Sequence, residues 1–391
     1  MDSFPTCCEG CHAVLPRCSV EKEIYQQWEI PEIKPFITQT TAHVVQCPEC
    51  KRRNTGPTTE QQRCGYGPRV DATVAQMMMD SEASKRQVAE LMSEVYQVPM
   101  SPASVVAAQT RVSQAVQLAV TETHEAAKQE LHKHADETPW KEGTKRGYLW
   151  TLVTPVATVF VIAMSRAGDV ARALLGTSGT LVTDRYSGYL WWAGALHQFC
   201  WAHLKRDFVA MSERTGLASE VGAKLVEETE RMFWWWSRFK NAEMSRKDFD
   251  IVMRGLQERV KWQLQRGVRA RDKKARGLCK TLLRNEASLW VFLSTEGVEP
   301  TNNAAEQAVR HGVLWRKRSH GTQSEKGSRF VERMLTVRAT LRAQKRGTFE
   351  YLVKACEAHR KGLPSPSLLK DPSPSARQIL RKESIGLGPP R

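Results

Sequence analysis

Residues 130–164, with the sequence ELHKHADETPWKEGTKRGYLWTLVTPVATVFVIAM, decide the fold class of this chain. Their β-branched and aromatic residues, interrupted by turn residues, predict three strands. These strands are expected at about 130–137, 147–154 and 157–164. The stretch from Gly147 to Ser165 has no charge and is long enough to cross a bilayer as a helix. Pro155 and the Val, Thr and Ile content favour two strands joined at the proline over that alternative.

The strand pattern continues beyond this stretch and alternates with helices. A helix is expected at 168–175, a strand at 180–184, and then a segment from His197 that begins extended and becomes helical. A meander of strands, a helix, a further strand and a late helix starting at Asn302 form the plan of a ribonuclease-H-like fold. The sequence therefore predicts an α/β protein with this fold as its core.

The charge balance of the chain predicts a polyanionic partner. Among 391 residues, 58 Lys and Arg outnumber 42 Asp and Glu, which gives a net charge of +16. A surplus of this size favours nucleic acid, and an anionic membrane surface is the alternative, although no basic amphipathic helix is obvious. The 41% apolar content excludes a wholly disordered chain. The first residues contain no signal peptide, so we expect a soluble cytoplasmic protein.

Seven of the ten cysteines lie within the first 64 residues, and four of them form two C-x-x-C pairs. Four thiolates in two such pairs are typical of a closed, tetrahedral, structural Zn²⁺ site. The expected ligands are Cys8, Cys11, Cys47 and Cys50. Alternating residues in WEIPEIKPFITQTTAHVVQ (28–46) predict short strands between the pairs. Whether this zinc-binding module contacts DNA or is only structural stays open, and Cys7, His12, Cys18 and Cys64 are spare ligands.

Three acidic residues are predicted to converge in the ribonuclease-H-like core. Asp136 lies in the first strand, Asp184 ends a later strand, and Glu306 lies where the late helix opens. Such carboxylates can hold two Mg²⁺ or Mn²⁺ ions for phosphoryl transfer. We choose Asp136 over its neighbour Glu137 because adjacent residues of a strand point to opposite faces. Each acid alone would more often be a solvated surface charge.

Five segments together resemble the DDE transposases of the insertion sequence 66 family. They are HADETPW (134–140), LVTDRYSGY (181–189), HQFCWAHLKRDF (197–208), PTNNAAEQAVR (300–310) and WRKRSHGTQSEKGSRFVERMLTV (315–337). The paired C-x-x-C motifs with IPEIKPFITQ between them are also similar to the zinc-binding domain of that family. The resemblance implies a metal-binding triad of Asp136, Asp184 and Glu306, and cleavage and strand transfer at the ends of a mobile element. It also implies a bacterial protein that acts on double-stranded DNA as a homo-oligomer, with possible accessory proteins.

The spacing of 122 residues between Asp184 and Glu306 (306 − 184) indicates a helical insertion within the core. Six segments are therefore expected. They are a zinc-binding domain (1–68), a helical segment (69–132), the first part of the core (133–210), a helical insertion (211–297), the last part of the core with C-terminal helices (298–362) and a disordered tail (363–391). Within the helical segment, residues 84–112 predict either a helix-turn-helix or a plain helical hairpin.

Two basic runs, 261–284 and 310–346, predict contacts with DNA phosphates, with a solvated surface as the alternative. The residues expected to bind DNA are Arg310, Arg316, Lys317, Arg318, Lys326 and Arg329.

Three other interpretations remain open. His132, His134 and Asp136 share one face of a strand and could be the ligands of a zinc hydrolase. Cys200-x-x-His203 could join a metal site or be a packing pair. The chain could also be an inactive, transposase-derived DNA-binding protein.

Overall fold

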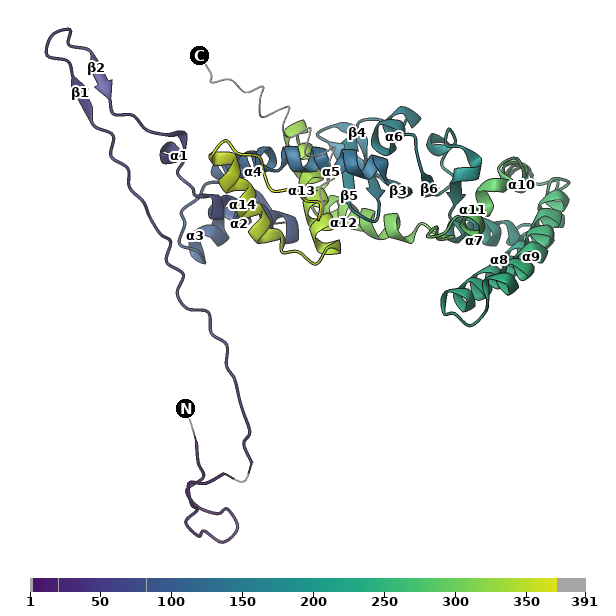
Figure 1. The fold of residues 1–391 in the computed structure, drawn as a ribbon, viewed down its shortest axis with the longest axis horizontal. Helices are drawn as coiled ribbons and strands as arrows, with labels where there is room; N and C mark the ends of the chain where they lie inside the picture. Colours follow the sequence, from purple (N-terminus) through teal and green to yellow (C-terminus); the bar gives the residue numbers. More distant parts are fainter. Residues whose placement is uncertain (1–2, 20, 82, 371–391) are drawn as a thin grey trace.

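The computed structural model describes residues 3–19, 21–81 and 83–370, and a five-stranded mixed sheet lies near the middle of the main body (Figure 1). Its strands are β3 (His132–Glu142), β4 (Lys145–Val153), β5 (Thr158–Ala163), β6 (Thr180–Thr183) and β7 (His197–Phe199). The spatial order is β5-β4-β3-β6-β7. The β3, β4 and β5 neighbours are antiparallel, whereas β6 runs parallel to β3 and β7 runs parallel to β6.

The sheet confirms the three strands expected within 130–164. The uncharged stretch around Pro155 forms the turn between β4 and β5, where Thr154 N–H donates to the carbonyl of Ala157 over 2.9 Å. No helix within the described part of the chain is long and apolar enough to span a bilayer. The α/β class is therefore confirmed.

Helices cover both faces of the sheet. One face packs on α12 (Asn303–Ser319) and α13 (Glu325–Ala343), and the other on α5 (Gln117–Gln129) and α6 (Gly168–Leu175). Helix α12 approaches β4 closely at Gly312. The space there is so small that a Cβ on this residue would overlap the side chain of Leu149. The register pairs Asp136 with Thr151 and Glu137 with Trp150. Asp136 therefore belongs to the α12 face, and Glu137 to the opposite face.

Helix α13 satisfies the free edge of the sheet through its side chains. Three backbone N–H groups of the edge strand β5 donate to residues spaced one helical turn apart on α13. The pairs are Thr158 with Thr340 Oγ1 (3.1 Å), Phe160 with Thr336 Oγ1 (3.0 Å) and Ile162 with Glu332 Oε2 (3.0 Å). An unpaired edge strand would otherwise leave these donors unsatisfied or open to another chain.

A helical layer precedes the sheet in the chain and packs with the last helix. It contains α2 (Pro68–Asp80), α3 (Lys85–Glu94), α4 (Pro102–Ala115) and α14 (Thr348–Arg360). The carboxylate of Asp71 on α2 is enclosed and accepts hydrogen bonds from Arg111 on α4 and Arg360 on α14. The helical stretch that follows Ser101 is divided at Val116 into α4 and α5 (Gln117–Gln129).

The helices between β7 and α12 form a unit with its own core (Figure 1). They are α7 (Trp201–Ser212), α8 (Leu217–Lys240), α9 (Arg246–Gly267), α10 (Lys273–Arg284) and α11 (Val291–Ser294). Trp235 and Trp236 pack against this core, whereas the side chain of Trp234 is half exposed. The helical character expected for 211–297 is therefore observed, and most of the tryptophan cluster has a packing role.

The N-terminal segment is extended and has little regular structure (Figure 1). It contains β1 (Val44–Gln46), β2 (Arg53–Thr55) and the short helix α1 (Glu60–Arg63). The strands expected at 28–43 are wrong: Trp28 and Phe36 are 90% and 96% exposed, and no partner strand pairs with this described stretch. Pro31 and Pro35 also remove backbone donors that a sheet would need.

The first part of the expected disordered tail is instead packed. Leu368 is fully buried, and its carbonyl accepts hydrogen bonds from Gln344 and Arg346 near the end of α13. The hydroxyl of Tyr351 on α14 donates to the carbonyl of Pro366 over 2.8 Å. The prediction from Pro and Ser content therefore placed the start of the disordered tail too early. Burial of Leu368 and Leu369 holds this stretch against the helices. The rest of the expected tail, 371–391, lies outside the described residues.

Candidate active site

Asp136 lies in the middle of β3 and shares its surroundings with the two other predicted acids. Its Oδ1 accepts the backbone N–H of Glu137 over 2.9 Å. Burial first, and then the negative charges of Glu137, Asp184 and Glu306, together raise the pKa of Asp136 to about 7. The structure thus places Asp184 and Glu306 close enough to Asp136 to oppose its ionisation.

Asp184 reaches the site because β6 lies beside β3. The parallel register pairs His134 with Val182, and the same offset of 48 residues continued along the strands brings Asp184 beside Asp136. Its Oδ1 accepts the backbone N–H of Tyr186 over 2.8 Å, which fixes the carboxylate at the turn that follows β6. The carboxylate is therefore held at the end of the strand, facing the edge where the helical unit begins.

Glu306 is positioned by Asn302, a buried residue whose role was missed from the sequence. Asn302 occupies the N-cap position of α12, but its side chain does not cap that helix. Instead its Nδ2 donates to the carbonyl of Ala135 over 2.7 Å, and its Oδ1 lies 3.2 Å from Nδ1 of His134. An Asn at an expected helix start was the available signal, although sequence alone favours ordinary capping there. Asn302 therefore fixes the first turn of α12, which bears Glu306, directly onto β3 beside Asp136.

A second set of side chains contacts Glu306 from the first turns of α7. His203 Nδ1 lies 3.3 Å from Glu306 Oε1, and Arg206 lies 3.6 Å from Oε2. The thiol of Cys200 donates to Oε1 over 3.9 Å. The Cys200-x-x-His203 motif therefore faces the predicted catalytic carboxylate, and a purely packing role does not describe it.

Glu137 lies behind Asp136 in a network on the other face of the sheet. Its Oε1 accepts two hydrogen bonds from Arg166 (2.9 and 2.5 Å), and its Oε2 accepts one from the hydroxyl of Tyr189. Arg166 stacks over the ring of Tyr186, and the backbone N–H of Tyr186 donates to Asp184. The sequence predicted that Glu137 points away from Asp136, and the register confirms this. Its replacement would nevertheless disturb a buried network next to the site, so Glu137 is not a neutral position.

The carboxylates of Asp136, Asp184 and Glu306 have the chemistry of ligands for a hard divalent cation, but among the described residues their oxygens do not all lie within 4.8 Å of one another. All three donate oxygen ligands, which Mg²⁺ and Mn²⁺ prefer. The raised pKa of Asp136 reflects burial and repulsion from the neighbouring acids, and a bound cation would relieve both effects. His134 instead contacts Asn302, and the His132–His134–Asp136 set does not form a ligand group among the described residues. The zinc-hydrolase alternative is therefore not supported.

The comparison with known families agrees with this geometry. The model of the family described as "Transposase IS66 family" matches residues 65–329. The chain belongs to this family. Among curated proteins, no match is found. Family membership gives this IS66-family protein a transposase role and thereby DNA as its partner, and the matched range contains Asp136, Asp184, Asn302 and Glu306.

The two cysteine pairs precede the range matched by the IS66 family. Within each pair the thiols approach each other, and backbone N–H groups of Cys11 and Cys50 are the main causes that lower the pKa of Cys8 and Cys47. The pairs lie at opposite ends of the extended N-terminal segment (Figure 1), and they form no joint ligand group among the described residues. The four-thiolate cage is therefore not assembled in this conformation, although each pair has the geometry of a half-site.

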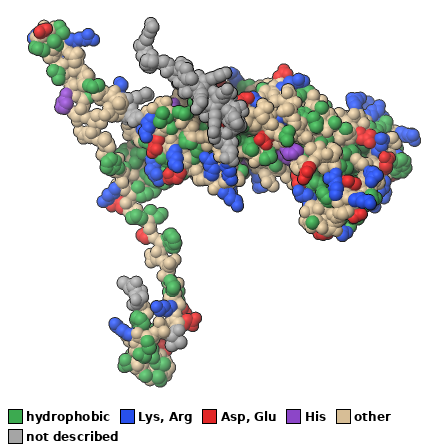
Figure 2. All heavy atoms as spheres, in the orientation of Figure 1, with side chains coloured by type: hydrophobic (Ala, Val, Ile, Leu, Met, Phe, Trp, Pro, Cys, Tyr) green, Lys and Arg blue, Asp and Glu red, His purple; other side chains and the backbone are tan. Residues whose placement is uncertain are grey.

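The predicted DNA-binding residues of this IS66-family protein fall into two groups. Arg310, Lys317 and Lys326 have exposed side chains on α12 and α13, whereas Arg318, although exposed, donates to the carbonyl of Ser81 over 3.2 Å. Arg316 and Arg329 are half-buried and bind protein groups: Arg316 donates to the carbonyl of Pro139, and Arg329 pairs with Glu332 over 2.8 Å. Figure 2 shows Lys and Arg distributed over both the central body and the helical unit. Only the first group is therefore well placed for phosphate contacts.

The structure does not support the helix-turn-helix alternative for 84–112. Arg111 is the single basic residue of its second helix, and it does not face outward. Arg111 forms a bidentate pair with the enclosed carboxylate of Asp71, with distances of 2.9 and 2.6 Å. Its guanidinium is therefore directed into the helical layer and away from a DNA groove. The segment is a helical hairpin that packs with α2 and α14.

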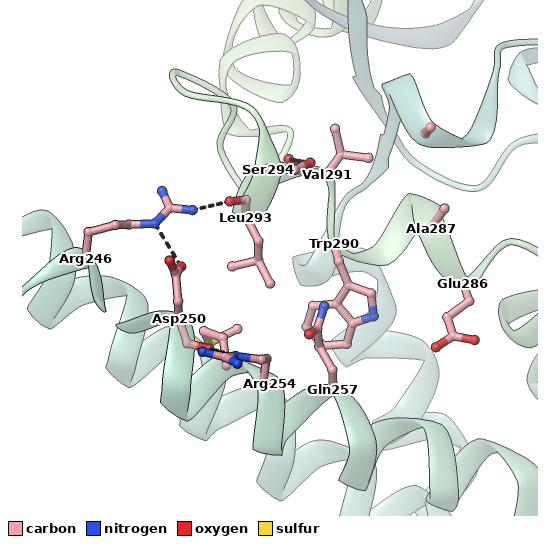
Figure 3. A pocket seen from close by; sticks show the side chains of 12 residues that line it. Arg246, Asp250, Arg254, Gln257, Glu286, Ala287, Trp290, Val291, Leu293 and Ser294 are labelled. Atoms are coloured by element: carbon pink, nitrogen blue, oxygen red, sulfur yellow. Dashed lines mark hydrogen bonds and ion pairs between the residues drawn. The ribbon is translucent and has the colours of Figure 1, made fainter. Parts of the chain in front are cut away.

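A cavity of about 740 Å³ in the helical unit is separate from the carboxylates (Figure 3). It lies between α9 and the segment around Trp290, with charged residues at its rim. Arg246 bridges its walls by pairing with Asp250 and donating to the carbonyl of Leu293. None of the predicted site residues lines this cavity. Its other charged residues are also engaged within the helical unit, since Arg254 donates to the carbonyl of Asp250 and Glu286 pairs with Lys261.

Proposed function

We propose that this IS66-family transposase cleaves DNA at the ends of an insertion sequence and transfers the strands to a target. Asp136, Asp184 and Glu306 would hold Mg²⁺ or Mn²⁺. The observation that carries the proposal is the parallel register of β3 and β6, which sets Asp184 beside Asp136, with the charges of Asp184 and Glu306 both opposing the ionisation of Asp136. Asn302 supports it, because a buried residue that ties Glu306 to β3 is expected where distant acids must act together.

We further propose that the sheet is a ribonuclease-H-like core interrupted by the helical unit α7–α11. The strand order β5-β4-β3-β6-β7, with an antiparallel meander followed by two parallel strands, supports this assignment. Helix α6 connects β5 to β6, and α12 returns to the sheet after the helical unit. The two shortest strands, β6 and β7, then lie between the meander and the insertion.

The chemistry of the proposed reaction is divided between the site and the surface. When bound, the divalent ions would activate the attacking oxygen and stabilise the leaving oxygen of the phosphodiester. Asp136 and Glu306 face the same side of the sheet and would hold these ions, while the N–H of Tyr186 keeps Asp184 in place. The exposed cations Arg310, Lys317 and Lys326 would bind the DNA backbone without reading sequence.

The N-terminal cysteines add a separate proposal. Cys8, Cys11, Cys47 and Cys50 would bind structural Zn²⁺ after the two pairs come together, because each pair already has backbone N–H groups that favour the thiolate. A homo-oligomer on DNA and accessory proteins of the element remain proposals that follow from the family. The alternative function is a transposase-derived protein that binds DNA without cleaving it.

Cleavage of labelled element-end DNA by the purified chain in Mg²⁺ tests the proposed function. Glu306→Gln removes a charge from the first turn of α12 and should reduce cleavage by several orders of magnitude while DNA binding persists. Glu325→Gln is the matched control, since Glu325 lies in the first turn of α13 and is exposed. Equal cleavage by the two variants would contradict the proposal, and binding without cleavage by the wild type would favour the alternative.

A further inference from the structure

A mixed ligand group lies beside the predicted catalytic carboxylates. Cys200 is the N-cap residue of α7, His203 lies in its first turn, and Glu306 lies in the first turn of α12. One potential ligand atom from each of these residues lies within 4.8 Å of the other two. Among the described residues this is the one such group of three, and neither Asp136 nor Asp184 belongs to it.

The ring of His203 leaves one nitrogen without a partner at this point. Its Nδ1 is enclosed and makes no hydrogen bond, although Glu306 Oε1 is only 3.3 Å away. The distance is short enough for an ion pair, but the alignment does not suit a hydrogen bond. An enclosed nitrogen lone pair that faces a carboxylate and a thiol is well placed to bind a cation.

The sulfur of Cys200 is positioned by the backbone around it. The backbone N–H of Asn302 donates to Sγ over 3.2 Å. Cys200 is also fixed to the sheet, since its own N–H donates to the carbonyl of Thr183 over 2.8 Å. The sulfur is therefore held rigidly between the end of β6 and the start of α12.

We propose that Cys200, His203 and Glu306 bind a thiophilic divalent cation of the Zn²⁺ class, with a fourth position left for water or another ligand. A set of one sulfur, one nitrogen and one oxygen suits Zn²⁺, whereas Mg²⁺ prefers oxygen alone. This site shares Glu306 with the proposed catalytic group. Only that shared role of Glu306 rests on the proposed function, because the other two ligands are distinct.

Binding of Co²⁺ to the metal-stripped full-length chain tests this proposal. Cys200→Ser should remove about one equivalent of bound Co²⁺ and the matching part of the thiolate-to-cobalt absorption band. Cys279→Ser is the matched control, because Cys279 is also buried but lies on α10 within the helical unit. It should bind as much Co²⁺ as the wild type.

His203→Gln provides an independent variant if Cys200→Ser does not fold. It should also lose about one equivalent of Co²⁺, since the site keeps only two of its three ligands. Folded variants at both positions that bind as much Co²⁺ as the wild type, with the same affinity, would overturn the proposal.

Asp136→Asn separates the two hypotheses that share Glu306. This variant should retain the Co²⁺ equivalent, because Asp136 is not part of the mixed group, while DNA cleavage is lost. Retained cleavage would reject the proposed catalytic function and leave the zinc-class site standing. Lost cleavage with unchanged Co²⁺ binding in both Cys200→Ser and His203→Gln would reject the zinc-class site alone.

Discussion

At the scale of single residues, Asp136 is a buried carboxyl group whose ionisation is costly in the metal-free protein. Its pKa rises from an ordinary value of 3.8 to about 7, first through burial and then through neighbouring negative charge. When the pKa of a carboxyl group is higher in the folded protein than in the unfolded chain, ionisation is easier in the unfolded chain. Raising the pH then favours unfolding. The stability that the neutral acid retains at pH 4 is therefore lost as the pH rises, and the loss is complete above about pH 7.

Asp136→Asn should therefore stabilise the chain against unfolding in a metal chelator at pH 8, by up to about 4 kcal/mol for a pKa raised from 3.8 to about 7. Well below pH 3.8 the substitution should have little effect, because Asp136 is then neutral in both states. Thermal unfolding across this pH range measures the difference. Asp169→Asn, at an exposed position in the first turn of α6, should show no such pH-dependent gain. A loss of stability at pH 8 in Asp136→Asn would contradict the electrostatic interpretation.

The residue scale also shows how far the sequence could go. The spacing and element types predicted Asp136, Asp184 and Glu306 as a triad, which stays a prediction: the charges of Asp184 and Glu306 act on Asp136, but the three carboxylates form no common ligand group among the described residues. The sequence could not reveal the role of Asn302. The side chain of Asn302 does not cap its own helix but donates to the carbonyl of Ala135, which is 167 residues away in the sequence. Local patterns predict local hydrogen bonds, whereas this role depends on the packing of α12 on β3.

At the scale of secondary-structure elements, α13 has two different surfaces. One surface satisfies β5 through Glu332, Thr336 and Thr340, and the other carries exposed cations such as Lys326. The basic run 310–346 was predicted as one DNA-binding surface, but Arg333 and Arg338 donate to the backbone of the preceding helices. Net charge alone could not separate these roles, because a structural Arg and a phosphate-binding Arg look the same in sequence.

Thr336→Val should destabilise the protein by about 1–3 kcal/mol, because it leaves the N–H of Phe160 buried without an acceptor. Denaturant unfolding measures this cost. Thr121→Val on α5 is the matched control: Thr121 is exposed, and its hydroxyl binds only the carbonyl of Gln117 one turn earlier. Its substitution should change stability by only a few tenths of a kcal/mol. Similar effects of the two substitutions would show that water or backbone movement satisfies the β5 edge.

Removal of three exposed cations from α12 and α13 should weaken DNA binding for all sequences alike. The variant combines Arg310→Ala, Lys317→Ala and Lys326→Ala, and the slope of log K against log salt should flatten by about 2.7 if each contacts one phosphate. Filter binding or fluorescence anisotropy across a salt series gives this slope. A control with Arg86→Ala, Lys354→Ala and Lys361→Ala removes the same charge from other exposed positions. An equal change of slope in both variants would show non-specific attraction by net charge.

At the scale of the whole molecule, the extended N-terminal segment differs most from what the sequence predicts. The sequence motif implies a closed zinc-binding domain, whereas this segment has large exposed apolar residues such as Trp28 and Phe36. A segment of this size with little apolar core needs a metal or disulfides to hold a fold. The elements of the main body were predictable because their apolar patterns specify a core. The arrangement of the N-terminal segment was not, because that segment buries little apolar surface in the structure.

Zn²⁺ should therefore change the shape of the whole chain. If Cys8 and Cys11 join Cys47 and Cys50 in one tetrahedral site, the two ends of the extended segment must come together, and the radius of gyration should fall on addition of Zn²⁺. Small-angle X-ray scattering with and without a chelator measures this change. A variant with Cys47→Ser and Cys50→Ser should remain extended in Zn²⁺, whereas Cys279→Ser, which alters a buried thiol of α10, should contract like the wild type. Contraction of the double variant would assign the change to other ligands, and an unchanged wild-type radius would mean that the two pairs do not share one ion.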